Sequence, residues 1–222
     1  MQTHVLPARR AAWRFNLVGW ASLAVILFWA LAAIAGPALA PHGVGDIVDD
    51  DFFGPISRAL PLGSDYLGRD MLSRIIYGTR YTVGISLAAV LLACTTGVVL
   101  GMTAAITGGW PDALLSRGLD ALNSIPSKLF GLVVVAAVGS SIPVLILTLA
   151  VIYTPGAFRF ARALAVNIGA MDFVTAARVR GEGTRYLIGA EILPNILGPV
   201  FADIGLRFVF IVLLLSGLSF LG

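Results

Sequence analysis

Uninterrupted apolar stretches, separated by short polar segments, make up most of the chain. A helix that crosses a bilayer needs about 20 mainly apolar residues, because the hydrocarbon layer is about 30 Å thick and a helix rises about 1.5 Å per residue. The stretches that satisfy this length are Leu17–Leu39, Tyr81–Ile106, Leu114–Val138, Pro143–Phe160 and Ile196–Leu221. The pattern therefore predicts an all-α integral membrane protein with about five transmembrane helices.

Glycine and proline positions refine three of these spans. In the second span, Gly97 and Gly101 have the spacing of small residues that lets another helix approach closely, so we predict a helix-packing role for both without naming the partner. In the third span, Pro126 is expected to kink the helix, because proline lacks an N–H and leaves a carbonyl unpaired. We expect Pro155 and Gly156 to weaken the end of the fourth span.

The first span also has features of a cleavable signal peptide. Arg9, Arg10 and Arg14 precede it, and the small-residue sequence Ala38-Leu39-Ala40 closes it. Its apolar run, however, is about twice as long as the usual signal-peptide core of about 7–15 residues. We therefore predict a retained transmembrane helix.

Composition supports the membrane interpretation. The 222 residues are 58% hydrophobic and 12% charged. Soluble domains contain a smaller share of apolar residues and are about 25% charged, because a soluble core of this size could not bury so much apolar surface. The single cysteine, Cys94, excludes a disulfide scaffold. The net charge of +3 is too small to indicate a nucleic-acid partner, so membrane lipid is the expected environment.

Arginine placement predicts the orientation, because cytoplasmic loops of membrane proteins collect Lys and Arg. Arg9, Arg10 and Arg14 place the N-terminus in the cytoplasm. Because each span reverses the side of the membrane, the loops alternate: residues 40–80 lie outside, 107–113 inside, 139–142 outside and 161–191 inside. The acidic character of the first of these loops and the arginines of the last agree with this multi-pass topology.

The sequence contains no recognisable catalytic or nucleotide-binding motif. It lacks the Gly-x-x-x-x-Gly-Lys-Ser/Thr phosphate loop, and His4 and His42 are too far apart to form a metal-binding pair. Cys94 lies among apolar residues, which is typical of a buried small side chain rather than a reactive thiol. We therefore predict a protein that is not an enzyme and itself binds no metal or cofactor, so that a partner or a gradient powers its work.

A short amphipathic helix is predicted near residues 172–183. Its expected face comprises residues spaced i, i+3, i+4 and i+7, namely Phe173, Ala176, Ala177 and Arg180. We expect Asp172 to cap its start and Gly181 and Gly183 to end it. Such a helix suits docking into a groove of another protein, although an ordinary connecting loop fits the pattern equally well.

Several motifs resemble those of ABC importer permeases. The Ala176-Ala177-x-x-x-Gly181 core, followed by Leu193-Pro194-Asn195, resembles their EAA loop. Other motifs are similar to the C-type subunit of the dipeptide/oligopeptide/nickel permease family: Pro61 to Arg74 (PLGSDYLGRDMLSR), Gly108-Gly109-Trp110-x-Asp112, Ile125-Pro126-Ser127 and Leu218-Ser219-Phe220-Leu221-Gly222. On this resemblance, residues 1–60 carry the cytoplasmic segment, the first helix and the start of the outer loop, and residues 61–222 form the permease core.

The resemblance implies the permease subunit of an ATP-binding-cassette importer in the bacterial inner membrane, which forms the path for peptides or a related solute such as a nickel chelate or an opine. Such a permease works with a homologous permease subunit, two cytoplasmic ATPase subunits that hold ATP and Mg²⁺, and an extracytoplasmic solute-binding protein. Its short loop helix would be the coupling helix that sits in an ATPase cleft. The implied coupling residues are Asp172, Phe173, Thr175, Ala176, Ala177, Arg178, Arg180, Gly181 and Glu182.

The chain departs from the family pattern in three places. Thr175 stands where the family usually has glutamate. Glu191, two residues before the Leu-Pro-Asn motif, takes the place of a frequent histidine. The family normally continues with a sixth helix, so a chain that stops at Gly222 is expected to be truncated or divergent.

Asp203 and Arg207 lie four residues apart within the fifth predicted span. A charged side chain inside a span costs about 2.5–3.5 kcal/mol on insertion scales and usually faces a cavity or a partner. The two side chains can pair on one helix face, or they can line the translocation path and meet a zwitterionic peptide.

Two other function classes fit parts of the sequence. A gradient-driven secondary transporter would use the Asp203–Arg207 pair, although such carriers usually contain inverted repeats and none is evident. An inert membrane scaffold would fit the absence of a final helix. Association with a cytoplasmic ATPase separates the importer from both.

Overall fold

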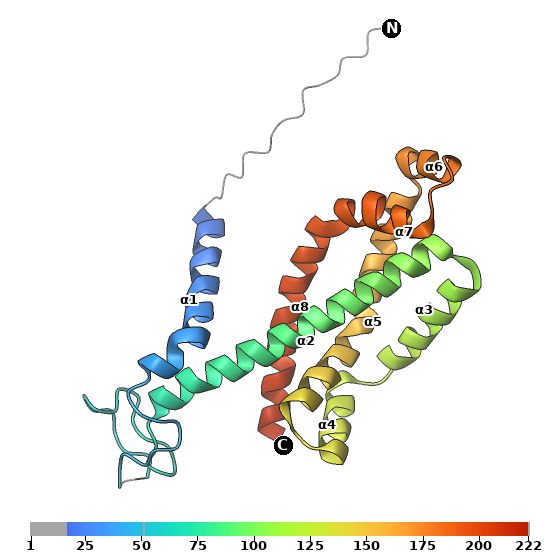
Figure 1. The fold of residues 1–222 in the computed structure, drawn as a ribbon. Coiled ribbons are helices and arrows are strands. Elements are labelled where there is room, and N and C mark those ends of the chain that lie inside the picture. The colour runs from blue at the N-terminus through green and yellow to red at the C-terminus, as the bar shows by residue number, and fades with distance from the viewer. Residues whose placement is uncertain (1–16, 51, 222) are drawn as a thin grey trace. The chain divides into compact units, whose positions relative to one another are not determined.

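The computed structural model describes residues 17–50 and 52–221, so the expectations for His4, Arg9, Arg10 and Arg14 lie outside the described residues. The described residues are 79% helical and form no strand, which confirms the all-α membrane fold. In chain order the helices are α1 (Leu17–Leu39), α2 (Met71–Thr107), α3 (Gly109–Asn123), α4 (Ser127–Val138), α5 (Ile142–Gly169), α6 (Asp172–Val179), α7 (Thr184–Tyr186), the π-helix η1 (Leu187–Ile192) and α8 (Leu193–Leu221) (Figure 1).

Four helical stretches in the described part are long and apolar enough to cross a membrane. They are α1, α2, α5 and the stretch Thr184–Phe220, which includes α7, η1 and most of α8. The pair α3 and α4 is a fifth candidate, which agrees with the prediction of about five spans. The bounds of α1 coincide with those predicted for the first span.

The expectation of one kinked helix around Pro126 is wrong. α3 and α4 are separate helices that meet at a bend of 80°. Pro126 is the residue just before α4, with φ −57° and ψ 122°. Proline fixes its own φ and disfavours the helical conformation of the residue before it, so the chain turns between Asn123 and Ser127 instead of continuing as a bent helix.

The predicted end of the fourth span is also wrong. α5 continues past Phe160 to Gly169, with Pro155 buried in its interior. Thr154 donates a hydrogen bond from Oγ1 to the Ala150 carbonyl at 2.7 Å, one turn earlier. Packing against neighbouring helices lets a long apolar helix tolerate proline. The segment that leads from Phe160 to Gly169 is therefore helix and not loop.

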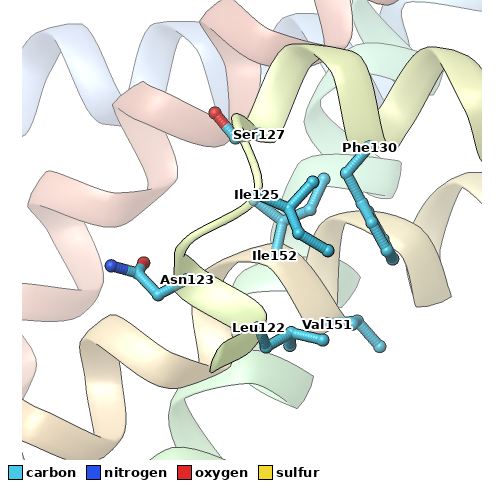
Figure 2. Close-up of a pocket in the computed structure, with 7 residues that line it drawn as sticks. All are labelled: Leu122, Asn123, Ile125, Ser127, Phe130, Val151 and Ile152. Carbon is cyan, nitrogen blue, oxygen red and sulfur yellow. The ribbon is translucent and has the colours of Figure 1, made fainter. Parts of the chain in front are cut away.

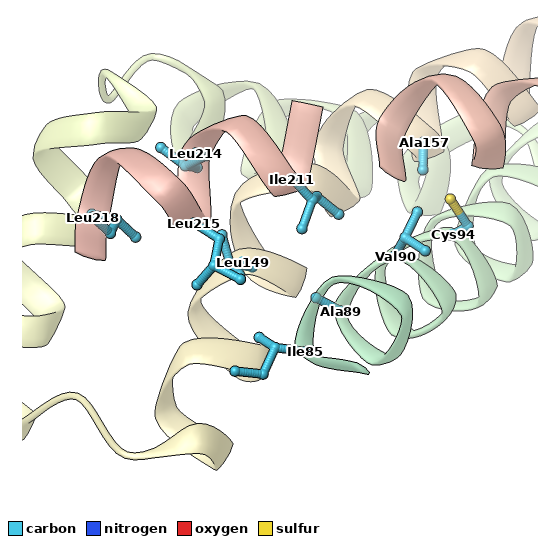
Figure 3. Close-up of a cluster of buried hydrophobic side chains, with 10 residues drawn as sticks. All are labelled: Ile85, Ala89, Val90, Cys94, Leu149, Ala157, Ile211, Leu214, Leu215 and Leu218. Carbon is cyan, nitrogen blue, oxygen red and sulfur yellow. The ribbon is translucent and has the colours of Figure 1, made fainter. Parts of the chain in front are cut away.

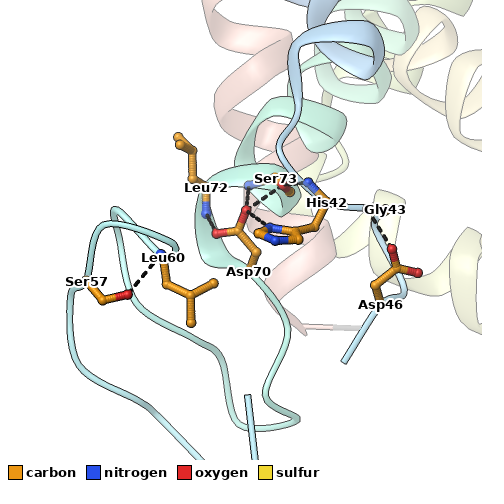
Figure 4. A network of polar contacts seen from close by, with 8 residues as sticks. All are labelled: His42, Gly43, Asp46, Ser57, Leu60, Asp70, Leu72 and Ser73. Atoms are coloured by element: carbon orange, nitrogen blue, oxygen red, sulfur yellow. Dashed lines mark hydrogen bonds and ion pairs between the residues drawn. The ribbon is translucent and has the colours of Figure 1, made fainter. Parts of the chain in front are cut away.

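The chain forms two compact units, residues 1–80 and 81–222, whose boundary lies within α2. In the first unit, Asp70 caps the start of α2: its Oδ1 accepts a hydrogen bond from the Leu72 N–H at 3.1 Å and its Oδ2 one from the Ser73 N–H at 3.2 Å. The Ser73 hydroxyl donates to Oδ2 at 2.5 Å, and His42 Nδ1 lies 3.2 Å from the same oxygen (Figure 4). These bonds explain why α2 begins at Met71, ahead of the predicted span.

A second buried carboxylate organises the loop before α2. Asp65 accepts hydrogen bonds from the backbone N–H groups of Leu67, at 2.8 Å, and Arg69, at 3.0 Å. The guanidinium groups of Arg69 and Arg74 pair with its other oxygen. Burial by itself would raise the pKa of Asp65, but the hydrogen bonds and the Arg69 charge outweigh this and lower that pKa to about 2.

Acid is expected to loosen this loop. Because the pKa of Asp65 is lower in the folded state than its ordinary value of 3.8, the carboxylate stabilises the fold fully above about pH 4. This stabilisation is lost as the pH falls towards 2. The protection factors of the amides in residues 52–70, that is, their exchange rates corrected for the intrinsic effect of pH, should therefore fall over this window, and they should fall less in Asp65→Asn. A wild-type loop as protected at pH 2 as at pH 5 would contradict this assignment.

In the second unit, α2, α5 and α8 share one apolar core. The buried side chains come from α2 (Ile85, Ala89, Val90, Cys94), α5 (Leu149, Ala157) and α8 (Ile211, Leu214, Leu215, Leu218), as Figure 3 shows. Cys94 is 2% exposed, in keeping with the expectation of a buried small side chain.

Close backbone contact joins α2 to α5 at the two glycines singled out in the sequence. A Cβ on Gly97 would lie 2.6 Å from the Ala157 Cβ, and one on Gly101 would lie 2.7 Å from the Phe158 carbonyl oxygen. Real Cβ atoms do not approach other atoms so closely. The helix that packs against Gly97 and Gly101 is therefore α5, which the spacing alone did not identify.

Candidate functional site

The short helix α6 lies between α5 and the helical stretch that ends in α8 (Figure 1). Its C-terminus has two bonds of a Schellman motif: the Glu182 N–H donates to the Ala177 carbonyl at 3.2 Å, and the Gly181 N–H donates to the Arg178 carbonyl at 2.9 Å. Gly181 has φ +85°, the left-handed conformation that this motif requires. The predicted helix end at Gly181 is thus present.

The start of α6 differs from the expectation. The residue before the helix is Met171, and no side chain makes a capping hydrogen bond there. Asp172 is the first helical residue, so it contributes only its negative charge near the positive end of the helix dipole. Gly183 has φ −78° and precedes α7, so it does not take part in ending α6.

One face of α6 is anchored in its own chain. Val174 and Ala177 are fully buried, and they cluster with Leu187 of η1. Ile106 of α2 and Ile168 of α5 pack against this cluster. Residues at the ends of α2, α5 and η1 therefore hold α6 in place.

The face expected from the sequence divides in two. Ala177 points into the chain, whereas Phe173, Ala176 and Arg180 are exposed. Val174 and Ala177 are three residues apart, which is the spacing of residues on one helix face. This spacing could have indicated the buried face, but other residue pairs of the eight-residue helix have it too. A role of Ala177 in coupling would therefore be to seat the helix rather than to contact a partner.

The opposite face of α6 is free in this chain. Its residues are Asp172, Thr175, Ala176 and Val179, and all are exposed. The Val179 side chain is 85% exposed, which is unusual for a valine of a packed helix. Thr175 donates from Oγ1 to the Met171 carbonyl at 3.3 Å and so satisfies its hydroxyl within the helix. The outward surface is small and largely uncharged, with Arg178 and Arg180 beside it.

Replacing Gly181 with alanine is expected to weaken the end of α6. An L-residue in the left-handed region costs about 1–2 kcal/mol, and no atom near Gly181 compensates for it. Gly183→Ala is the matched control, because Gly183 has an ordinary φ and equally open surroundings. Amide exchange in α6 should accelerate several-fold for Gly181→Ala alone; equal acceleration in both variants would refute the role of the left-handed conformation.

The π-helix η1 connects this site to α8. Pro194 lacks an N–H, and in a regular α-helix its ring would crowd the carbonyl oxygen one turn earlier. The wider π turns of η1 lie immediately before it and give the ring room. The exposed Arg180 side chain lies 4.0 Å from Glu182 and 3.9 Å from Glu191, so water screens both contacts. The Asn195 side chain donates to the Glu191 carbonyl at 2.6 Å. The Leu-Pro-Asn motif therefore forms the first turn of α8, which follows η1 without a break.

Asp203 and Arg207 pair with each other in α8. Arg207 Nε donates to Asp203 Oδ2 at 2.6 Å, and the two side chains are 15% and 13% exposed respectively. The Arg207 guanidinium lies against Gly156 of α5, where a Cβ would come within 2.5 Å of it. The two side chains therefore neutralise each other, as one of the two hypotheses from the sequence expected.

A small pocket lies at the break between α3 and α4. Figure 2 shows the apolar side chains of Ile125, Phe130 and Ile152 on one side of the break and the Asn123 amide on the other. Within residues 17–50 and 52–221, no group of three or more His, Cys, Asp or Glu side chains is arranged to hold a metal ion.

Comparison with known proteins gives consistent results. A model of the family "binding-protein-dependent transport system inner membrane component" matches residues 97–222. The chain is 35% identical over 206 residues to the dipeptide transport system permease protein DppC of Haemophilus influenzae, a match that covers 90% of this chain and 70% of the relative. It is 32% identical to the di/tripeptide transport system permease protein DppC of Pseudomonas aeruginosa, over 93% of this chain and 69% of that relative.

Proposed function

The chain belongs to the family of binding-protein-dependent transport system inner membrane components, and we propose that it forms the translocation path for peptides in an ATP-driven importer. It is a membrane permease subunit of the ABC peptide-transporter type. The observation that carries the proposal is α6, a short helix seated on α2, α5 and η1 with an exposed, mostly uncharged outer face.

The partners follow from this family. A homologous permease subunit, two cytoplasmic ATPase subunits and an extracytoplasmic binding protein would complete the importer, and ATP and Mg²⁺ would be held by the ATPases. The coupling residues proposed from the sequence are those of α6 and its C-terminal turn. The two faces of α6 have different roles. Val174 and Ala177 hold the helix in place, and the outer face around Ala176 and Val179 binds the ATPase.

The proposed orientation places α6 in the cytoplasm and the acidic loop before α2 outside. Arg178, Arg180 and Arg185 around α6 support this, because positive loop residues remain on the cytoplasmic side. The predicted N-terminus is then cytoplasmic as well. An outer loop folded around Asp65 and Asp70 would give the binding protein a structured surface.

Peptides are the substrate class that we propose first, because the named relatives carry dipeptides and tripeptides. Nickel chelates and opine-like conjugates stay alternatives, since related permeases carry them. Uptake of labelled dipeptides, nickel chelates and opines into cells that express the whole system, with and without this chain, separates these substrates. The proposal predicts loss of dipeptide uptake in cells without the chain.

The energy source separates the importer from a gradient-driven carrier. In proteoliposomes that contain the assembled system, uptake should require ATP and persist when an ionophore dissipates ion gradients. Uptake that needs no ATP and stops with the ionophore would establish the secondary carrier instead. A system that neither transports nor binds an ATPase would support the scaffold.

Asp203 and Arg207 are proposed to line the path, as a second role beyond their mutual pairing. Converting both to neutral residues, Asp203→Asn with Arg207→Gln, leaves no uncompensated charge in the span, so assembly should persist. We expect dipeptide uptake to fall about tenfold, because a zwitterionic peptide would lose both charged contacts. Unchanged uptake kinetics in a normally assembled double variant would leave the pair with a packing role alone.

A further inference from the structure

α3 is held to the rest of the second unit in an unusual way. None of its residues is buried, in contrast to α5, which buries many of its side chains. Its leucines Leu115, Leu119 and Leu122 are half-buried. Two ion pairs also join α3 to α5: Asp112 with Arg162, and Asp120 with Arg159. Because no side chain of α3 is fully buried, these polar contacts contribute to its position.

The Asp112–Arg162 pair is the stronger of the two. Arg162 Nε donates to Asp112 Oδ1 and its terminal nitrogen to Oδ2, each at 2.5 Å, so the contact is bidentate. The two side chains are 18% and 36% exposed, and the Ser116 hydroxyl lies 3.3 Å from the same carboxylate. In the Asp120–Arg159 pair, the atoms are 3.9 Å apart and both side chains are more than half exposed, so water screens it.

Both ends of α3 are suited to movement. Gly108 and Gly109, with φ of +61° and +58°, connect it to α2, and no atom lies within 4 Å of where their Cβ would be. At the other end, the chain bends by 80° between Asn123 and Ser127. α3 therefore lies between two left-handed glycines and a sharp bend, and its strongest polar contact with α5 is the Asp112–Arg162 pair.

The contact lies close to the proposed coupling site. Arg162 is on α5, whose C-terminal end carries Ile168, which packs against α6. The Arg162 backbone N also lies against Gly101 of α2, since a Cβ there would come within 2.9 Å of it. The residue that holds α3 is thus itself fixed against α2 through its own backbone.

We propose that the Asp112–Arg162 pair is a latch that pins α3 to α5 and opens during the transport cycle. With the pair closed, α3 is fixed against α5; with the pair open, α3 swings about Gly108–Gly109 and the break before Ser127. Arg162 is in this sense a positioning residue, which acts through α3 and not on the solute. The role in the cycle rests on the proposed function, whereas the latch itself does not.

Spin labels test the latch directly. The full chain in native-lipid vesicles carries cysteine replacements at two exposed positions, Arg117 of α3 and Val166 of α5, in a Cys94→Ala background. Electron paramagnetic resonance gives the distance distribution between them. Asp112→Asn should raise the ratio of detached to attached α3 by about five- to tenfold, as expected for loss of a charge-assisted pair. The exchanged pair Asp112→Arg with Arg162→Asp should restore the attached population.

Asp120→Asn is the matched control on the same helix, and it should leave the distribution unchanged because its ion pair is long and exposed. If Asp112→Asn does not accumulate, Arg162→Lys keeps the charge, loses the bidentate geometry and should shift the ratio in the same direction. An unshifted distribution in these variants, an equal shift in Asp120→Asn, or no restoration by the exchanged pair overturns the latch.

Uptake separates the latch from its role in the cycle. ATP-dependent dipeptide uptake per assembled complex should fall several-fold in Asp112→Asn and return in the exchanged pair. A detached α3 with unchanged uptake overturns the role in the cycle. Because the distance measurement needs no ATPase, a failed association with ATPase subunits refutes the proposed function and leaves the latch result standing.

Discussion

The variant Gly101→Leu is expected to prevent the chain from accumulating as folded protein. A Cβ at position 101 would lie 2.7 Å from the Phe158 carbonyl oxygen and 2.9 Å from the Arg162 N, and both are backbone atoms of α5 that cannot rotate away. Even alanine forces α2 and α5 apart, which costs about 1–3 kcal/mol in a packed core. Leucine adds three more carbon atoms at the same contact, so the effect is larger.

Gly84→Leu is the matched control, because Gly84 is exposed on the same helix and no atom lies near its Cβ position. Size-exclusion chromatography after mild detergent extraction measures the folded fraction of each variant. We expect a normal peak for Gly84→Leu, a reduced peak for Gly101→Ala and none for Gly101→Leu. Equal peaks for the two leucine variants would show that the backbone contact between α2 and α5 does not support the fold.

The second large effect is expected on the outer face of α6. Ala176→Arg places a long charged side chain on the surface proposed to enter the ATPase cleft, while the buried residues Val174 and Ala177 keep their contacts. Co-purification with the ATPase should therefore fall at least about tenfold, with normal extraction and folding of the permease. Ala177→Leu should act differently, because it overfills the buried seat of α6 and loosens the helix itself.

Ala190→Arg controls for the added charge, since Ala190 is exposed on η1 beyond the coupling segment. It should retain ATPase association. Amide exchange in α6 distinguishes the mechanisms: protection should persist in Ala176→Arg and fall in Ala177→Leu. If Ala176→Arg retains full association with the ATPase, the outward face of α6 is not the docking surface.

The long apolar helices were predictable from the sequence because membrane insertion is decided locally. The helix α1 follows from an uncharged apolar run of sufficient length. The left-handed Gly181 at the end of α6 followed in the same way, because few residues other than glycine adopt that conformation.

Features that depend on contacts between distant residues could not be predicted. Arg162 falls in the segment 161–191 that was predicted to be an inner loop, but it lies on α5, and its partner Asp112 is fifty residues earlier in the chain. Pro126 was assigned a kink, but whether a proline bends a helix or separates two depends on the packing on either side. On α6 the spacing did not show that Ala177 faces the core, because two turns of helix cannot define which apolar pair lies inside.

Site-directed photocrosslinking from Val179 tests the central claim most directly. A photoreactive amino acid at this outward position of α6, in cells that express the whole transport system, should yield a covalent adduct with a cytoplasmic ATP-binding subunit. The same residue at Val166, which is exposed on α5, should yield no such adduct. An ATPase adduct from position 179 alone is the predicted result; no adduct from position 179, or an equal one from position 166, would contradict coupling through α6.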